Sequence, residues 1–196
     1  FTSTIAEAGA FVKTKDELDI PNIQFHYAPA MIVDHGRTLL WGTGMSCHSC
    51  LLRPKSRGEV TLASSDPFAD PLIDPKFLSH PDDMKDMVDG YKIMMKVLGA
   101  EPFSKYISEH TQRPIDINDD ADIEQAMREG ADTVYHPVGT CKMGNDAMSV
   151  VDSRLNVHSM RGLRVVDASI MPTLVGGNTN APTIMIGEKA SDMILE

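Results

Sequence analysis

The chain has 196 residues and a formal net charge of -10, with 42% hydrophobic and 23% charged residues. This length suits one domain, or one domain with a short segment of another, and the composition favours a folded core over disorder. The acidic balance disfavours nucleic acid as a partner, because phosphate binding needs a basic surface. No apolar run reaches the roughly 18 to 20 residues that span a bilayer. The 3 cysteines cannot all pair in disulfides, which favours a reducing compartment.

Strand patterns dominate the first part of the chain. Segments that are apolar and β-branched, or that alternate polar and apolar residues, predict strands or extended pieces at residues 23–33, 38–52, 58–64 and 71–75. Trp41 lies in the second of these segments and is therefore expected in the core, with a cation–π face for a ligand as the alternative.

A first helix is predicted after Ser79, which can cap it, with Pro81 in the first turn and Gly99 at its end. Its apolar residues recur at helical spacing and are expected in a core rather than in a cofactor site: Met84, Met87, Val88, Tyr91, Met94 and Leu98. Further helices are predicted at residues 102–110, 121–128 and 181–195, and a strand at 162–169. Because strands and helices are grouped rather than strictly alternating, the fold class is predicted to be α+β.

A C-x-x-C spacing at Cys47 and Cys50, with His48 between them, suggests a metal or redox site. Zinc normally takes four ligands, and the only other cysteine is Cys141. Residues three apart in a strand also point to opposite faces, so these two thiols are not expected to hold one ion. Buried strand cysteines are the favoured interpretation, no metal is predicted, and a zinc- or thiol-binding module is kept as the rival hypothesis.

The start of the last predicted helix is more specific. Residues 176–183 read GGNTNAPT, in which Asn180 can cap the helix and Pro182 fits its first turn. Such a terminus directs unpaired N–H groups and about half a positive charge at whatever lies before it, which suits an anion. The alternative is a capped helix with no ligand.

A histidine directly before a proline stands in the segment at residues 133–144, TVYHPVGTCKMG. Pro137 restricts His136 to extended backbone and so fixes the direction of its ring. A histidine that titrates near neutral pH can act as an acid or a base, but a histidine beside a turn is also a common structural feature.

Together, residues 133–144, 162–172 and 178–189 resemble the C-terminal signature of the glucose–methanol–choline (GMC) flavoprotein oxidoreductases, in the choline dehydrogenase and alcohol dehydrogenase branch. Residues 7–11, 21–25, 52–58 and 74–78 resemble substrate-domain segments of the same family, in order. The dinucleotide fingerprint G-x-G-x-x-G is absent, and residues 42–44 lack its third glycine. The chain also begins at Phe1 rather than at a methionine, so we expect a C-terminal fragment that is inactive on its own and whose partner is the missing N-terminal FAD-binding domain.

The resemblance implies a substrate-binding domain at residues 1–160, with a mainly antiparallel sheet and helices on one face. Residues 161–196 would return to the FAD domain as one strand and one helix. The implied reaction is oxidation of a primary alcohol, with choline a leading candidate, to the aldehyde by hydride transfer to FAD. An oxidase of the same family that uses oxygen is the nearest alternative. The expected location is the cytoplasm, with peripheral association at the inner membrane as an alternative.

The resemblance also assigns site residues. His136 corresponds to the active-site histidine of the family, and Asn178 to its second active-site position. The positions implied to approach FAD are Asp167, Ala168, Thr179, Asn180, Pro182 and Thr183. Glu7, in an E-x-G-x-F context, is implied to lie near the trimethylammonium of choline, and a salt-bridged or solvated glutamate is the equal alternative.

Overall fold

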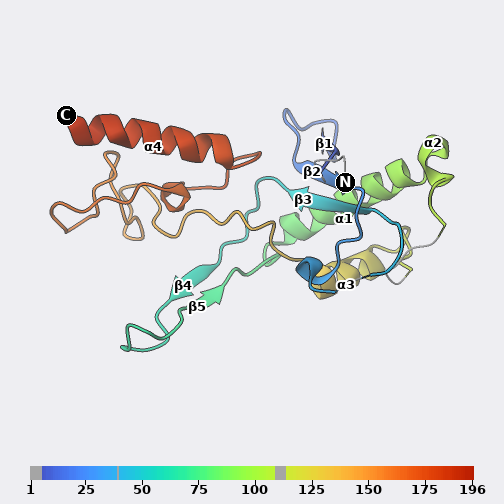
Figure 1. The fold of residues 1–196 in the computed structure, drawn as a ribbon, viewed down its shortest axis with the longest axis horizontal. Helices are drawn as coiled ribbons and strands as arrows, with labels where there is room; N and C mark the ends of the chain where they lie inside the picture. Colours follow the sequence, from blue (N-terminus) through green and yellow to red (C-terminus); the bar gives the residue numbers. More distant parts are fainter. Residues whose placement is uncertain (1–5, 39, 109–113) are drawn as a thin grey trace. The chain divides into compact units, whose positions relative to one another are not determined.

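The computed structural model describes residues 6–38, 40–108 and 114–196 (Figure 1). The chain forms two compact units, which we describe separately. Unit 1 comprises Phe1–Lys55 and Leu78–Asp132, and unit 2 comprises Ser56–Phe77 and Thr133–Glu196. The division expected at residue 160 concerns the domains of a longer protein, and it stays a prediction.

Unit 1 is built on a three-stranded antiparallel sheet with the order β1-β2-β3, formed by Ala8–Val12, Ile23–Ala28 and Ser46–Leu51. Helix α1, Pro81–Leu98, packs on this sheet, where Ile23 and Phe25 share a buried cluster with Met94. Helix α3, Asp120–Gly130, packs on α1 through Ile123 and Met127. The antiparallel sheet and its helices confirm the predicted α+β class.

The methionine spacing of α1 predicted its packing correctly. Met84, Val88 and Met94 are buried, and Met87, Tyr91 and Leu98 pack against the same clusters. The predicted cap was wrong by one residue. His80 caps the helix, because its Nδ1 accepts a hydrogen bond from the Asp82 backbone N–H at 3.2 Å.

Three other predictions for unit 1 were wrong in extent. The strand expected at 38–52 is β3 alone, and the one expected at 23–33 ends with β2 at Ala28. Between them lies a long connection that includes a 3₁₀ turn, η1, at Asp34–Gly36. Trp41 lies in that connection and is 96% exposed, so its expected place in the core was wrong. The helix expected at 102–110 is only α2, Glu101–Ser104, and residues 109 and 110 lie outside the described residues.

Unit 2 contains a two-stranded antiparallel hairpin, β4 at Glu59–Thr61 and β5 at Leu72–Asp74. It also contains a 3₁₀ turn, η2, at Ala168–Ile170, and helix α4 at Asn180–Leu195. Its core is a cluster of six buried residues: Val151, Leu155, Ile170, Met171, Ile186 and Ala190.

The strand predicted at 162–169, a segment that the structure describes in full, was wrong. Arg164 makes one isolated antiparallel bridge to Asn156, and the segment ends in η2. The Val165 N–H donates to the Leu155 carbonyl at 3.2 Å, so this backbone pairs with a loop. A strand needs a neighbouring strand to continue its ladder, and a loop offers only single bonds.

Helix α4 differs from expectation at its start and is exposed along its outer side. Its N-cap is Thr179 rather than Asn180, without a side-chain hydrogen bond. In its mostly apolar first half, Ile184 is 59% and Met185 is 57% exposed. Only Ile186 and Ala190 of α4 are buried. Among the described residues, no helix combines the length and the apolar character that a membrane span requires.

Gly90 gives a test of the packing between α1 and the sheet. A Cβ at Gly90 would lie 2.9 Å from Ile23 Cγ1, in a cluster where Ile23 has no exposed surface. We expect Gly90→Val to lower the free energy of unfolding by about 1 to 3 kcal/mol, because overpacking exceeds the gain in helix propensity. Gly187→Ala in α4, where a Cβ would meet nothing within 4 Å, should instead stabilise by about 0.5 to 1 kcal/mol. Urea unfolding followed by circular dichroism measures both, and a stabilised Gly90→Val would contradict the packing.

Candidate active site

The loop that carries His136 is tied by its backbone to η2. The Cys141 N–H donates to the Ser169 carbonyl at 3.0 Å, and the Met143 N–H donates to the Ile170 carbonyl at 2.8 Å. Gly139 has a φ of +89°, and a Cβ there would lie 3.3 Å from the Met171 carbonyl oxygen. Glycine therefore suits this position both for its backbone angle and for the close approach of the two segments.

Turn η2 is in turn packed against α4. Ile170 and Met171 belong to the same buried cluster as Ile186 and Ala190 of the helix, and Val138 packs on its edge. Three sequence motifs that lie up to 50 residues apart are thus gathered around one small core. The structure places His136, Asp167, Ala168 and the predicted residues of 178–183 in unit 2.

His136 itself is exposed and follows a strained residue. Tyr135 has a φ of +66°, the left-handed region that residues other than glycine rarely adopt. The Tyr135 N–H donates to the Thr133 hydroxyl oxygen at 2.9 Å, which closes a local turn. Backbone strain of this kind clusters at functional sites, where it fixes the direction of a neighbouring side chain. Sequence reasoning missed Tyr135, and no side-chain pattern signals a positive φ at a tyrosine.

The start of α4 presents backbone N–H groups without a side-chain cap. The Thr183 N–H and hydroxyl both donate to the Thr179 carbonyl, at 3.0 and 2.7 Å, which closes the first turn. Pro182 has no N–H, and Asn180 and Asn178 are exposed. The first N–H groups of a helix have no partner inside it and carry its positive end. This terminus can therefore receive an anion or an oxygen that gains negative charge.

Asp167 also has a local role. Its carboxylate caps η2, because Oδ1 accepts from the Ser169 N–H at 2.7 Å. Ala168 is half-buried and packs against the core of unit 2. Asp167 is exposed, so the cap leaves a side of the carboxylate open to a ligand.

A small ionic network follows the His136 loop and was not anticipated from the sequence. The carboxylate of Asp146 accepts from Lys142 Nζ at 2.9 Å, from the Ser149 hydroxyl at 2.8 Å and from the Met148 N–H at 2.9 Å. Hydrogen bonds from Lys142, then Ser149, lower the pKa of Asp146 to about 2. His158 Nε2 lies 3.0 Å from the Gly144 carbonyl oxygen and adds a contact to the same turn. The lysine and aspartate four residues apart were the signal available in the sequence.

Glu7 lies in unit 1, one residue before β1, and is exposed to solvent. The contact of Glu7 with a trimethylammonium group and its alternative, a salt-bridged or solvated glutamate, both stay predictions. Glu7 and His136 belong to different units.

The C-x-x-C motif forms part of β3, as expected. Cys47 pairs with Tyr27 and Cys50 with Gln24 in the register with β2, and these partners lie on opposite faces of the sheet. Burial raises the pKa of both thiols and lowers the pKa of His48. Within the described part of the chain, no three His, Cys, Asp or Glu residues lie close enough to hold a metal ion. The geometry does not favour a zinc- or thiol-binding module.

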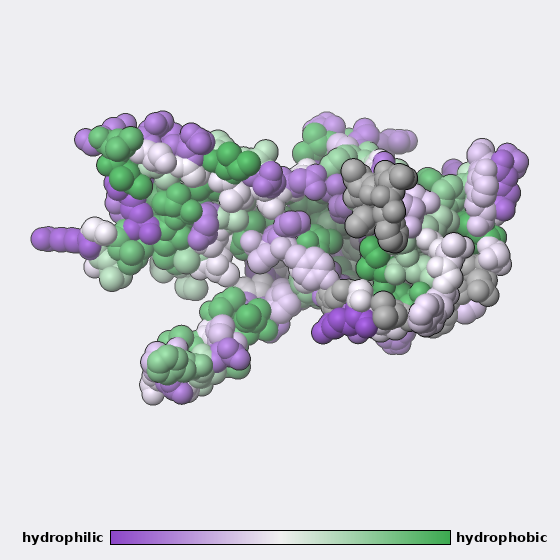
Figure 2. All heavy atoms as spheres, viewed as in Figure 1, coloured by the Kyte–Doolittle hydropathy of each residue, from purple (hydrophilic) through white to green (hydrophobic). Residues whose placement is uncertain are grey.

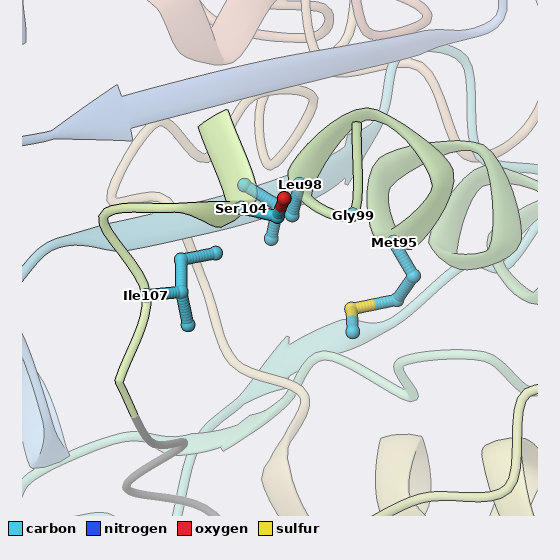
Figure 3. Close-up of a pocket in the computed structure, with 5 residues that line it drawn as sticks. All are labelled: Met95, Leu98, Gly99, Ser104 and Ile107. Carbon is cyan, nitrogen blue, oxygen red and sulfur yellow. The ribbon is translucent and has the colours of Figure 1, made fainter. Parts of the chain in front are cut away.

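A pocket in unit 1 is a poor candidate for acid–base chemistry (Figure 3). It has a volume of about 240 Å³ and is lined by Met95, Leu98, Gly99, Ser104 and Ile107 at the end of α1 and around α2. Its walls are apolar apart from the Ser104 hydroxyl and backbone groups, and none of these five residues has a side chain that titrates near neutral pH. The candidate site therefore rests on the residues of unit 2.

Residues 54–187 match the family model described as GMC oxidoreductase. This match covers more than half of the chain, and the chain belongs to the GMC oxidoreductase family. Enzymes of this family depend on FAD.

Individual relatives agree with this assignment. An alcohol dehydrogenase (acceptor) from Pseudomonas putida is 50% identical over 194 residues, which are 99% of this chain and 35% of that protein. An oxygen-dependent choline dehydrogenase from Klebsiella pneumoniae is 43% identical over 96% of this chain and 34% of that protein. A formate oxidase from Aspergillus oryzae, studied for the effect of a mutation on FAD modification, superimposes with a TM-score of 0.82 at 28% identity, over 90% of this chain and 32% of that one. The chain thus spans about a third of the length of the relatives it matches.

The residues present fit FAD. The uncapped start of α4 offers donors to an electron-rich ring edge, and Asp167 and Ala168 lie on η2, which packs against the same helix. These are the positions that would hold the cofactor.

The Lys142–Asp146 pair predicts a titration. Because the folded pKa of Asp146 is depressed to about 2, its contribution to stability is present above the ordinary carboxyl value near 4 and is lost as the pH falls toward 2. Carbon-13 NMR of the side-chain carboxyl should show a midpoint near 2, and Lys142→Met should move it toward the ordinary value. Lys189→Met, which removes an exposed lysine of α4, should leave it unchanged. An unmoved midpoint in Lys142→Met would rule out the lysine as the cause.

Proposed function

We propose that this chain is the C-terminal part of an FAD-dependent dehydrogenase that oxidises a primary alcohol to the aldehyde. The observation that carries the proposal is the gathering of the His136 loop, η2 and the start of α4 around one core. The family membership and the names of the alcohol dehydrogenase and choline dehydrogenase relatives support alcohol oxidation.

In this proposal, bound FAD supplies the acceptor for the hydride that leaves the carbinol carbon. His136 accepts the hydroxyl proton, since an imidazole is a side chain that can take up and release a proton in enzymatic acid–base chemistry. Asn178 donates a hydrogen bond to the developing alkoxide without competing for its proton. The strained backbone of Tyr135 and the restriction that Pro137 places on the preceding residue hold the His136 backbone in place. The ring therefore needs little reorganisation to reach the hydroxyl.

The start of α4 has a role in binding the flavin in this proposal. Its N–H groups and the residues Thr179, Asn180, Pro182 and Thr183 would lie against the part of the flavin that becomes electron-rich on reduction. A helix N-terminus stabilises negative charge by roughly 0.3 to 1 kcal/mol at an exposed site. Removing water from the site would strengthen the effect.

Choline is the leading candidate substrate, and the argument for it is the charge of Glu7. An exposed carboxylate can attract a trimethylammonium group, whereas a neutral alcohol gains nothing from it. The 50% identical relative is named an alcohol dehydrogenase, which makes a neutral primary alcohol the second candidate. An oxidase that passes electrons to oxygen is the alternative for the acceptor, and a peroxide assay on the full-length parent separates it from a dehydrogenase.

The two proposed catalytic residues can be tested in the full-length parent by anaerobic single-turnover reduction of the flavin. His136→Ala should slow reduction by roughly a hundredfold or more, the usual range for a positioned acid–base group. Asn178→Ala should slow it by about ten- to a hundredfold, because one neutral donor is lost and the base remains. The double variant should fall short of the product, since both groups act on the same oxygen.

The control is Asn145→Ala, which removes an exposed asparagine of the same unit and should leave the rate near that of the unchanged enzyme. Flavin content is measured for every variant, so that loss of cofactor is not mistaken for loss of chemistry. Reduction of His136→Ala at a near-normal rate, with full flavin content, would remove this histidine from the mechanism.

Glu7 separates the two substrate candidates. If choline is the substrate, Glu7→Gln in the parent should raise the KM for choline roughly tenfold or more and should leave the KM for 3,3-dimethylbutan-1-ol, its neutral isostere, nearly unchanged. Glu17→Gln, another exposed glutamate of unit 1, serves as the control and should change neither value. Equal changes for both alcohols in Glu7→Gln would take Glu7 out of the substrate site and favour a neutral alcohol.

A further inference from the structure

The hairpin β4–β5 and its connection form an ordered arm with no buried residue. Every residue from 57 to 77, all of which the structure describes, is exposed. The two strands pair with each other, with Val60 opposite Ile73. We call residues 57–77 the arm. An isolated two-stranded hairpin is marginally stable in water, so interactions other than the pairing of β4 with β5 must stabilise the arm.

The arm is nevertheless specified by its sequence. A Cβ at Gly58 would overlap the Asp74 carbonyl oxygen, so the two strands approach more closely at the base than a side chain permits. Lys76 has a φ of +49°, and its ammonium pairs with Glu59 at 2.8 Å. At the tip, the Phe68 N–H donates to the Asp66 carboxylate at 3.0 Å. These features give one definite shape to a segment without a core.

One face of the arm is apolar. The register of the strands places Val60 and Ile73 on that face, and they are 47% and 69% exposed. Leu62, 86% exposed, follows β4 directly. The opposite face carries the pairs of Glu59 with Asp74 and of Thr61 with Leu72, and is more polar. Figure 2 shows hydrophobic side chains on the arm with hydrophilic ones between them. Contiguous exposed apolar surface of this kind marks a contact that the isolated chain does not make.

A second copy of the chain does not fit this surface. Acidic residues outnumber basic ones along the arm, and the whole chain carries a net charge of -10, so two copies repel each other. Pro71 and Pro75 flank β5, and prolines at these positions hinder the addition of another strand along that edge. The arm is therefore suited to contact by its face rather than by edge pairing.

The length of the relatives indicates what covers the arm. The arm lies inside the matched family region, 54–187, and this chain spans only 35% and 34% of the two curated relatives. We propose that the apolar face of the arm docks on an apolar surface of the parent polypeptide that lies outside these 196 residues. This docking rests on the proposed function in one respect, because both require a longer parent polypeptide. It is independent of the hydride chemistry.

Hydrogen–deuterium exchange of the isolated chain and of the full-length parent tests this docking. In a dilute solution of the isolated chain, the amides of β4 and β5 should exchange nearly without protection. In the parent, the same amides should be protected at least a hundredfold. Strong protection in the isolated chain at every concentration would overturn the proposal, and protection that rises with chain concentration would assign the face to a second copy instead.

Single lysine substitutions then locate the contact. In the parent, Val60→Lys and Ile73→Lys should raise exchange throughout the arm and lower the melting temperature, because a charge would enter an apolar contact. Thr61→Lys, on the opposite face, is the matched control and should do neither. In the isolated chain all three should unfold like the unchanged protein. Equal effects of Val60→Lys and Thr61→Lys in the parent would show that the apolar face is not the contact. If a variant fails to fold, the exchange of the unchanged proteins still decides the proposal.

Discussion

The buried contact between η2 and α4 is the constraint on which the candidate site depends. Ile170 and Met171 on one side and Ile186 and Ala190 on the other exclude water together, and each such side chain contributes roughly 1 to 3 kcal/mol on burial. The loop after His136 has no helix or strand of its own and takes its position from backbone bonds to η2. If this core loosened, the position of His136 relative to the start of α4 would no longer be fixed.

The side chains proposed for chemistry, by contrast, are exposed. His136, Asn178 and Asn180 face solvent, and so do the apolar Ile184 and Met185 one turn further along α4. A hydride transfer site has to exclude water, and polar groups gain strength when water is removed. The exposed face of α4 and the arm both belong to unit 2, so this unit provides a rigid frame together with apolar surfaces that another part of a parent enzyme can cover.

Unit 1 is held together by the packing of α1 on its sheet. Its sheet is closed on one face by α1, whose helical spacing brings Met94 onto Ile23 and Phe25. Gly90 permits this close approach, since a side chain there would press on Ile23. The long connection between β2 and β3 is left outside this packing and carries the exposed Trp41. The scaffold of unit 1 is thus decided by a few contacts of α1, while the connection between β2 and β3 contributes no residue to its buried clusters.

The sequence by itself determined the local features that depend on near neighbours. The spacing of apolar residues determined α1, the separation of Cys47 and Cys50 argued against a shared metal ion, and the order of the motifs indicated the family. Only the tertiary structure decided features that depend on distant partners. Residues 162–169 have strand-like composition, but the backbone beside them is a loop, so no ladder forms. Trp41 is apolar, but it is exposed in the part of the chain that the structure describes. The left-handed backbone of Tyr135 leaves no trace in the pattern of side chains.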